Sequence, residues 1–208
     1  MKFKPGDPID HDLCTALKHE FLRCEDAFRD CEVYVSKTAA SSSQTENFLI
    51  AYKAYNAYSR FIHHLYEFIL GAIARETGDT TQLEANEAER HIAAHAQRIL
   101  TGRRQAILKG TAPVWENDIS YYPEKIPADF AKEFRQFRNQ SFGHVTHRRS
   151  TISMSDFYAK YHKYVHMPYW NCRGSWGLRE GDFPDLKEIT KFSFLIKSSP
   201  PRPETSDE

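Results

Sequence analysis

Apolar residues recur three or four positions apart along most of this chain, a spacing that places them on one face of a helix. The spacing predicts a first long helix over residues 9–37 and a second over residues 46–77, which Gly78 can end. A third helix is expected over residues 82–109, with Gly110 as its stop. The sequence therefore predicts an all-α fold.

The helical pattern continues through a segment rich in phenylalanine. A fourth helix is expected to begin near Pro127, because proline suits the first helical position, and to run into residues 138–149. A fifth is expected over residues 156–166, with Ser153 or Ser155 as its cap. Pro168 then closes the helical part of the chain.

These elements divide the chain into two parts. We expect residues 1–166 to form an antiparallel bundle of four to five helices. Residues 167–208 differ in composition, with five prolines and three glycines, and predict an irregular C-terminal extension. Within it, the alternating residues 192–197 can form a short strand, and the last ten residues are expected to be a disordered tail.

Composition and charge exclude several classes of protein. The best apolar stretch, residues 65–74, contains Glu67 and is ten residues long, against about 20 for a membrane span. The first residues lack the apolar segment of an export signal, and the four cysteines form no C-x-x-C pair, so we expect a cytoplasmic protein with reduced thiols. With 28 basic and 28 acidic residues, attraction to nucleic acid requires a local basic patch.

The most informative stretch is Phe137-Arg138-Asn139-Gln140-Ser141-Phe142-Gly143-His144. An arginine is followed directly by a polar residue and, after five intervening residues, by a histidine. This block resembles the Arg–polar–x–His signature of the HEPN superfamily, small all-helical proteins found in toxin–antitoxin and phage-defence systems. A second match, from Arg90 to His95, lies in the middle of an alanine-rich helix, so the first is preferred.

The resemblance implies a metal-independent endoribonuclease, acting as a toxin or a phage-defence effector without any cofactor. Arg138 would stabilise the phosphate, His144 would act as the general acid or base, and Asn139 would orient one of them. A neutral histidine, with a pKa of about 6.5, can take the proton from a ribose 2′-hydroxyl. The resemblance also implies a homodimer with the motif at its interface, RNA as the partner, and an antitoxin protein as a further one.

Helix geometry constrains how the motif can work. On an unbroken helix, Arg138 would lie about 120° from His144, so both could not reach one phosphate. Gly143 can relax this constraint by weakening the helix. A second subunit can relax it too, by supplying the partner Arg138 or His144.

A local excess of positive charge surrounds the motif. Residues 131–166 contain seven Lys or Arg and two Asp or Glu, a net charge of +5. Arg135, His147, Arg148 and Arg149 are the residues expected to bind RNA. The alternative is that basic residues near a helix end complement the helix dipole.

Histidine pairs raise the question of a metal site. His91 and His95, and likewise His162 and His166, are four residues apart on one helical face. Zinc needs three or four ligands, so solvated histidines are favoured and no metal is predicted. The doublet at 63 and 64 is expected to place one imidazole in the core and one in solvent.

Two other functions remain open. The chain could be a non-catalytic HEPN-like bundle that binds nucleotide, RNA or a partner protein. Thr146 favours this reading, because some toxin branches of the family carry a tyrosine two residues after the histidine. The third reading is a metal-binding helical protein built on the histidine pairs.

Overall fold

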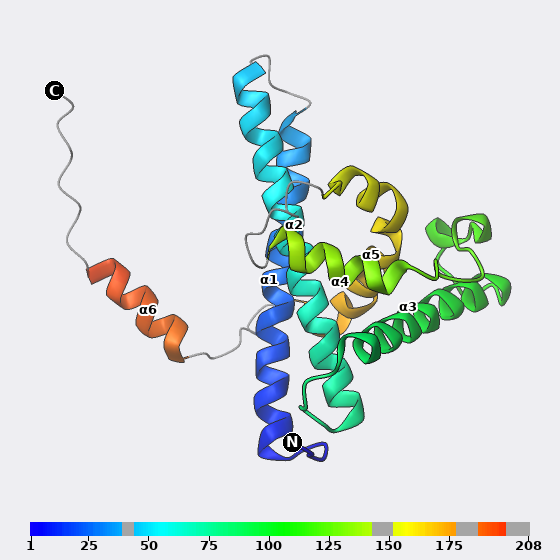
Figure 1. Ribbon diagram of the computed structural model, residues 1–208, viewed down its shortest axis with the longest axis horizontal. Coiled ribbons are helices and arrows are strands. Elements are labelled where there is room, and N and C mark those ends of the chain that lie inside the picture. The colour runs from blue at the N-terminus through cyan, green and yellow to red at the C-terminus, as the bar shows by residue number, and fades with distance from the viewer. Residues whose placement is uncertain (39–43, 143–151, 178–186, 199–208) are drawn as a thin grey trace. The chain divides into compact units, whose positions relative to one another are not determined.

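The computed structural model describes residues 1–38, 44–142, 152–177 and 187–198, and it confirms the all-α fold (Figure 1). The helices and 3-10 turns are α1 (Pro8–Thr38), α2 (Gln44–Thr77), α3 (Ala85–Leu108), η1 (Val114–Glu116), η2 (Ile119–Tyr121), α4 (Phe130–Ser141), α5 (Met154–Trp176) and α6 (Lys187–Ser198). The described residues contain one isolated β-bridge, between Lys2 and Asp79, and no sheet. The chain divides into a compact unit, Met1–Gly177, and a second unit, Leu178–Glu208.

The first two helices form an antiparallel hairpin (Figure 1). Their apolar faces meet in a continuous core, as the spacing predicts: Leu17, Phe21 and Cys24 are buried on α1, and Phe61, Leu65 and Phe68 on α2. Ring centroids lie 4.8 Å apart for Phe21 and Phe68, and 4.8 Å for Phe28 and Phe61. All four cysteines are free.

Helices α4 and α5 cover this hairpin with a second aromatic layer. The phenylalanine-rich segment forms α4, and Phe130, Phe134 and Phe137 are buried along it. Phe134 meets Tyr66 of α2 edge-on at 5.2 Å, and Phe137 stacks on Phe157 of α5 at 4.3 Å. Because aromatic pairs in these geometries add to the burial of apolar area, they fix where α4 sits on α2.

Helix boundaries differ from prediction in two places. Helix α4 begins at Phe130 rather than near Pro127, and the Phe130 amide donates to the Pro127 carbonyl across 3.1 Å. Helix α5 continues through Pro168 to Trp176, so the predicted boundary at residue 166 falls inside a helix. A proline inside a helix costs about 3 kcal/mol, but Pro168 is fully buried and Tyr169 stacks on Phe21 at 5.8 Å. Packing on both sides of the proline outweighs the lost hydrogen bond.

The predicted strand at residues 192–197 is wrong, because these residues belong to helix α6. Ile189, Phe192 and Ile196 are also three and four positions apart, which is helical spacing. A short apolar run cannot distinguish helix from strand by period alone. No strand among the described residues could pair with it. The predicted tail, 199–208, lies outside the described residues.

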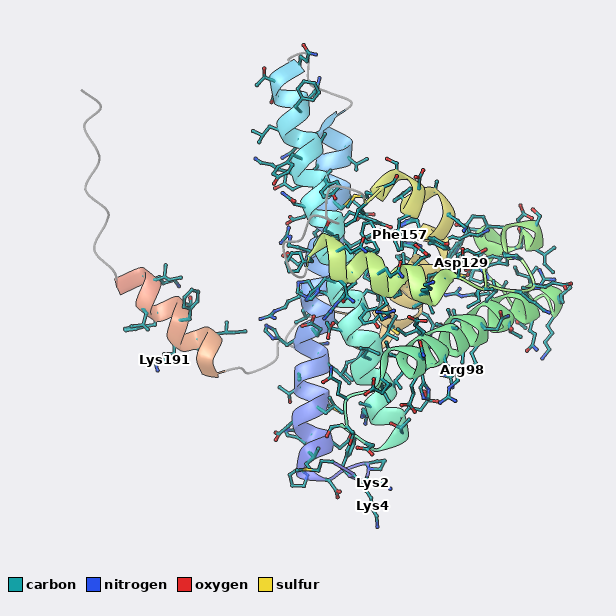
Figure 2. All side chains as sticks on the ribbon, in the orientation of Figure 1. Lys2, Lys4, Arg98, Asp129, Phe157 and Lys191 are labelled. Atoms are coloured by element: carbon teal, nitrogen blue, oxygen red, sulfur yellow. The ribbon has the colours of Figure 1, made fainter. Side chains whose placement is uncertain are left out.

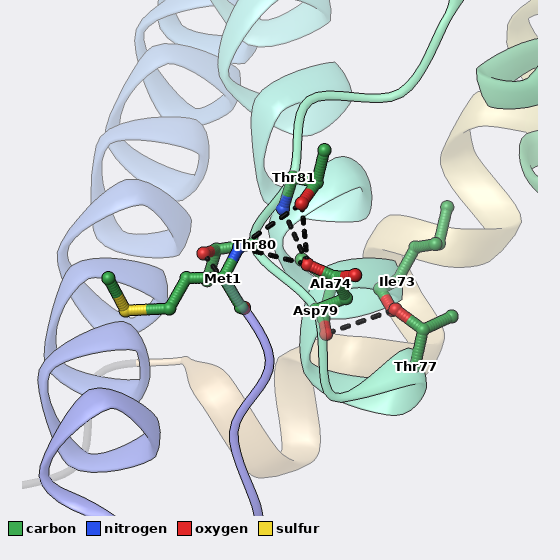
Figure 3. Close-up of polar contacts among 7 residues, drawn as sticks. All are labelled: Met1, Ile73, Ala74, Thr77, Asp79, Thr80 and Thr81. Atoms are coloured by element: carbon green, nitrogen blue, oxygen red, sulfur yellow. Dashed lines mark hydrogen bonds and ion pairs between the residues drawn. The ribbon is translucent and has the colours of Figure 1, made fainter.

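The end of α2 is fixed by a small polar network (Figure 3). Gly78 has a φ of +66°, as expected of a residue that ends a helix. The amide and hydroxyl of Thr81 donate to Asp79 across 2.9 and 2.7 Å and hold the pKa of that carboxyl below its ordinary value. The Met1 ammonium group also donates to Asp79, across 3.0 Å, and the Phe3 amide donates to the Gly78 carbonyl across 2.8 Å.

Replacing Gly78 with alanine should lower the free energy of unfolding. Alanine at this positive φ costs about 1–2 kcal/mol. Its Cβ would also lie 2.8 Å from the Phe3 carbonyl oxygen, which should add about 1–3 kcal/mol of overpacking. Gly110→Ala is the matched control, since Gly110 has a φ of +68° but no atom within 4 Å of that Cβ. Chemical denaturation should show a larger loss of unfolding free energy for Gly78→Ala than for Gly110→Ala. Equal losses would exclude a destabilising contact between the new Cβ and the Phe3 carbonyl oxygen.

Candidate functional site

The last turns of α4 hold Arg138 and Asn139, the first two residues of the motif. Nη1 of Arg138 donates to Asn139 Oδ1 across 2.7 Å, and Nη2 donates to Glu67 of α2. The guanidinium carbon lies 5.5 Å from the centroid of the Tyr66 ring. The Arg138 side chain is 28% exposed. The guanidinium is therefore fixed in place yet reachable from solvent.

Two hollows meet at Arg138. One has a volume of about 800 Å³, and Thr80, Thr81, Arg135 and Asn139 are among the residues of its wall. The other has a volume of about 420 Å³ and is lined on one side by Glu20, Arg23, His63 and His64. Leu13, Glu67, Gly71 and Arg138 belong to both walls. Arg138 thus stands where a ligand in either hollow could reach it.

Two histidines and a glutamate gather in the smaller hollow. His64 Nδ1 lies 2.7 Å from Glu20 Oε1, and both side chains are mostly buried. The His63 ring lies 5.2 Å from the His64 ring and 4.8 Å from Phe142, the residue that caps α4. Neither histidine is fully buried and neither is fully exposed, so the predicted split into one core and one solvent imidazole is wrong.

Burial and charge set the protonation of this cluster. Burial lowers the pKa of His63, and the nearby Arg138 guanidinium lowers it further. Burial alone would raise the pKa of Glu20, but the hydrogen bond and charge of His64, together with Arg23, bring it below its ordinary value. Because both pKa values are lowered, His63 is neutral and Glu20 is ionised at neutral pH. Titratable groups with shifted pKa values in a hollow are typical of functional sites.

The remaining motif residues lie partly outside the described chain. His144, His147, Arg148 and Arg149 all fall within residues 143–151, which the structure does not describe. Helix α4 ends at Ser141, with Phe142 as its capping residue. The offset of about 120° between Arg138 and His144, which assumed one unbroken helix, therefore does not apply.

The predicted basic patch is partly neutralised by carboxylates. Arg135 Nε lies 2.6 Å from Glu89 Oε1, and Lys160 Nζ lies 2.6 Å from Asp129, labelled in Figure 2 at the start of α4. Arg138, a third basic residue of this patch, forms an ion pair with Glu67. The excess positive charge available to RNA is thus smaller than the sequence count suggests.

The histidine pairs have other partners. Tyr58 OH lies 3.0 Å from His162 Nδ1, and the His162 ring stacks on Tyr158 at 4.2 Å. His95 Nδ1 lies 3.3 Å from a guanidinium nitrogen of Arg98. Within the described part of the chain, no three His, Cys, Asp or Glu residues are placed to hold a metal ion.

Sequence reasoning missed Glu20 and Glu67, and it did not connect His64 with the motif. Glu67 pairs with Arg138 across 71 positions, and Glu20 pairs with His64 across 44. Two signals were present in the sequence: a charged residue inside the apolar stretch 65–74, and a histidine doublet on the same helix.

Comparison of the chain with protein-family models, with curated proteins and with solved structures finds no match. None of the described helices combines the length and the apolar character that a membrane span requires.

Arg138→Gln should raise the pKa of His63, because it removes a positive charge that disfavours the imidazolium. The unfolded chain takes up this proton near pH 6.5, whereas folded His63 takes it up at a lower pH. The contribution of His63 therefore lowers the free energy of unfolding as the pH drops below about 6.5. Arg138→Gln should lose less of this free energy than the wild type does over the same pH range. NMR titration of the His63 ring protons gives the pKa directly. Arg90→Gln, on the exposed side of α3, is the control, and an equal effect of both variants would contradict the assignment.

Proposed function

We propose that the protein is a metal-independent, HEPN-like endoribonuclease that acts as a toxin or phage-defence effector. One observation carries the proposal: Arg138, the arginine of the motif, is held by Glu67 and Asn139 at the wall of a hollow that also contains two imidazoles. A fixed guanidinium can stabilise a phosphate, and groups beside it that exchange protons can assist cleavage of an RNA phosphodiester.

In the proposed reaction, Arg138 binds the scissile phosphate. His144 takes the proton from the 2′-hydroxyl, the 2′-oxygen bonds to phosphorus, and the bond from phosphorus to the 5′-oxygen breaks. The products are a 2′,3′-cyclic phosphate and a 5′-hydroxyl end. Asn139 accepts a hydrogen bond from Arg138, which supports a positioning role for its side chain.

A buried donor supports phosphate binding by Arg138. Its Nε atom is buried and has no hydrogen-bond partner among the residues that the structure describes. An unsatisfied buried donor costs about 1–3 kcal/mol, which a phosphate oxygen would relieve. Arg135, His147, Arg148 and Arg149 are the residues proposed to contact the RNA backbone.

The ion pair between Arg138 and Glu67 favours a second candidate function, a non-catalytic HEPN-like bundle that binds nucleotide, RNA or a partner protein. Glu67 already compensates the charge of the guanidinium. In this alternative, Arg138 has a structural role and no bond in RNA is broken. The two functions differ in one measurable product.

The purified protein should cleave RNA in excess EDTA and leave cyclic phosphate ends. Arg138→Ala and His144→Ala should each lower the rate by about 10²–10⁴-fold, the contribution of a positioned acid–base or charged group. Arg90→Ala and His95→Ala, from the other Arg–His match in the chain, are the controls and should keep full activity. Binding without cleavage would favour the non-catalytic bundle, and sensitivity to EDTA would favour the metal-binding reading.

Mixing the two inactive variants tests the proposed homodimer. If Arg138 of one subunit works with His144 of the other, a mixed dimer of Arg138→Ala and His144→Ala has one intact site. After subunit exchange, about a quarter of the wild-type activity should return, since half of the dimers are mixed and each has one working site. Absence of recovery in dimers shown to have exchanged would exclude a site shared across the interface.

A further inference from the structure

The smaller hollow contains an imidazole whose orientation is fixed by a carboxylate. His64 Nδ1 and Glu20 Oε1 lie 2.7 Å apart across the contact of α1 with α2. Because Glu20 is ionised and can only accept, Nδ1 must carry the proton of this hydrogen bond. Nε2 is then the nitrogen that can take up and release a proton. A carboxylate that orients an imidazole in this way is a recurring device of acid–base catalysis.

We propose that His64 is a second acid–base group of the candidate site, oriented by Glu20, and that it protonates the departing 5′-oxygen of the RNA. This proposal rests on the proposed ribonuclease function. His64 and Arg138 line the same hollow, and the His64 ring lies 6.4 Å from the ring of Phe142, which caps the helix that carries Arg138. His64 is thus the catalytic residue in this step, and Glu20 is a positioning residue.

The reaction needs two proton transfers. One proton leaves the 2′-hydroxyl as the 2′-oxygen bonds to phosphorus, and His144 accepts it. One proton must reach the 5′-oxygen as its bond to phosphorus breaks, and His64 donates it from Nε2. The electron pair of the broken bond stays on the 5′-oxygen, so the two imidazoles end with exchanged protonation states and no co-reactant is consumed.

His64 suits this role better than its neighbour. Burial and Arg138 lower the pKa of His63, which keeps that ring neutral. Glu20 instead accepts a hydrogen bond from Nδ1 of His64, which fixes the orientation of that ring. The charged and titratable groups around this hollow are His19, Glu20 and Arg23 of α1, His63 and Glu67 of α2, and Arg138 of α4.

A substrate with a better leaving group separates a proton donor from a merely structural residue. We would compare an ordinary RNA oligonucleotide with one that carries sulfur in place of the bridging 5′-oxygen at one position. The sulfur departs as a thiolate and needs no proton. His64→Ala should lose about 10²–10⁴-fold on the oxygen substrate and recover most of this loss on the sulfur substrate. His144→Ala should be slow on both substrates.

Two further variants keep the test decisive if His64→Ala folds poorly. His64→Asn retains a donor for Glu20 but has no group that can protonate the leaving oxygen, so it should behave as His64→Ala does. Glu20→Gln should show a smaller loss with the same recovery on the sulfur substrate, because the donor is still present but an ionised carboxylate no longer fixes its orientation. His11→Ala, exposed in the first turns of α1, is the matched control.

The outcomes distinguish this proposal from the function on which it rests. If the wild type cleaves no RNA, both fail together. If the wild type cleaves RNA and the His64 variants cleave the oxygen substrate equally fast, the role of His64 alone is wrong. Equal losses on both substrates, in variants with the wild-type melting temperature, would also overturn it, because a thiolate departs without a proton and removal of the proton donor should not slow its departure.

Discussion

The packing of α1 against α2 is the contact on which the rest of this molecule depends. Phe21 is fully buried between the hairpin and α5, in contact with Phe68 and Tyr169. The helices approach so closely that a Cβ at Gly71 would lie 2.7 Å from Leu17 Cδ2. Polar pairs then form along the edges of the same apolar stripe: Glu20 with His64, Asp10 with Arg75, and Asp30 with Arg60. The candidate acid–base pair is thus a product of core packing, since neither helix alone would bring its two members together.

The position of Arg138 follows from the amphipathic character of α4. Phe130, Phe134 and Phe137 bury one face of this helix against α2 and α5. Arg138 comes one residue after the last of them, and one residue is about 100° of helical rotation. It therefore lies at the edge of the buried face, where its guanidinium lies over the Tyr66 ring and donates to Glu67. Its contacts with Tyr66, Glu67 and Asn139 hold the guanidinium at this edge.

Local signals in the sequence predicted the helices well, but they did not reveal the contacts that surround the candidate site. The end of α2 was predictable because Gly78 supplies the positive φ that a helix end requires. The end of α5 was not, because the cost of Pro168 is a local signal whereas the packing that offsets it comes from α1 and α2. Arg138 and Asn139 were visible as a motif of adjacent residues. Their partner Glu67, and the pairing of His64 with Glu20, depend on contacts between distant segments, which periodicity cannot reveal.

The pairing of Arg138 with Glu67 has two opposite effects on an incoming phosphate. The carboxylate holds the guanidinium in place, so less side-chain freedom is lost when a ligand binds. It also repels the phosphate, because both groups are anions competing for the same donors. The side chains of Arg138 and Glu67 are 28% and 34% exposed, so water screens the attraction between them and an exposed pair contributes only about 0–1 kcal/mol. Exchange of one anion for the other is therefore cheap, while the hydrogen bond to Asn139 keeps the guanidinium oriented. An arginine held in this way would meet the phosphate of the proposed RNA substrate with its guanidinium already oriented.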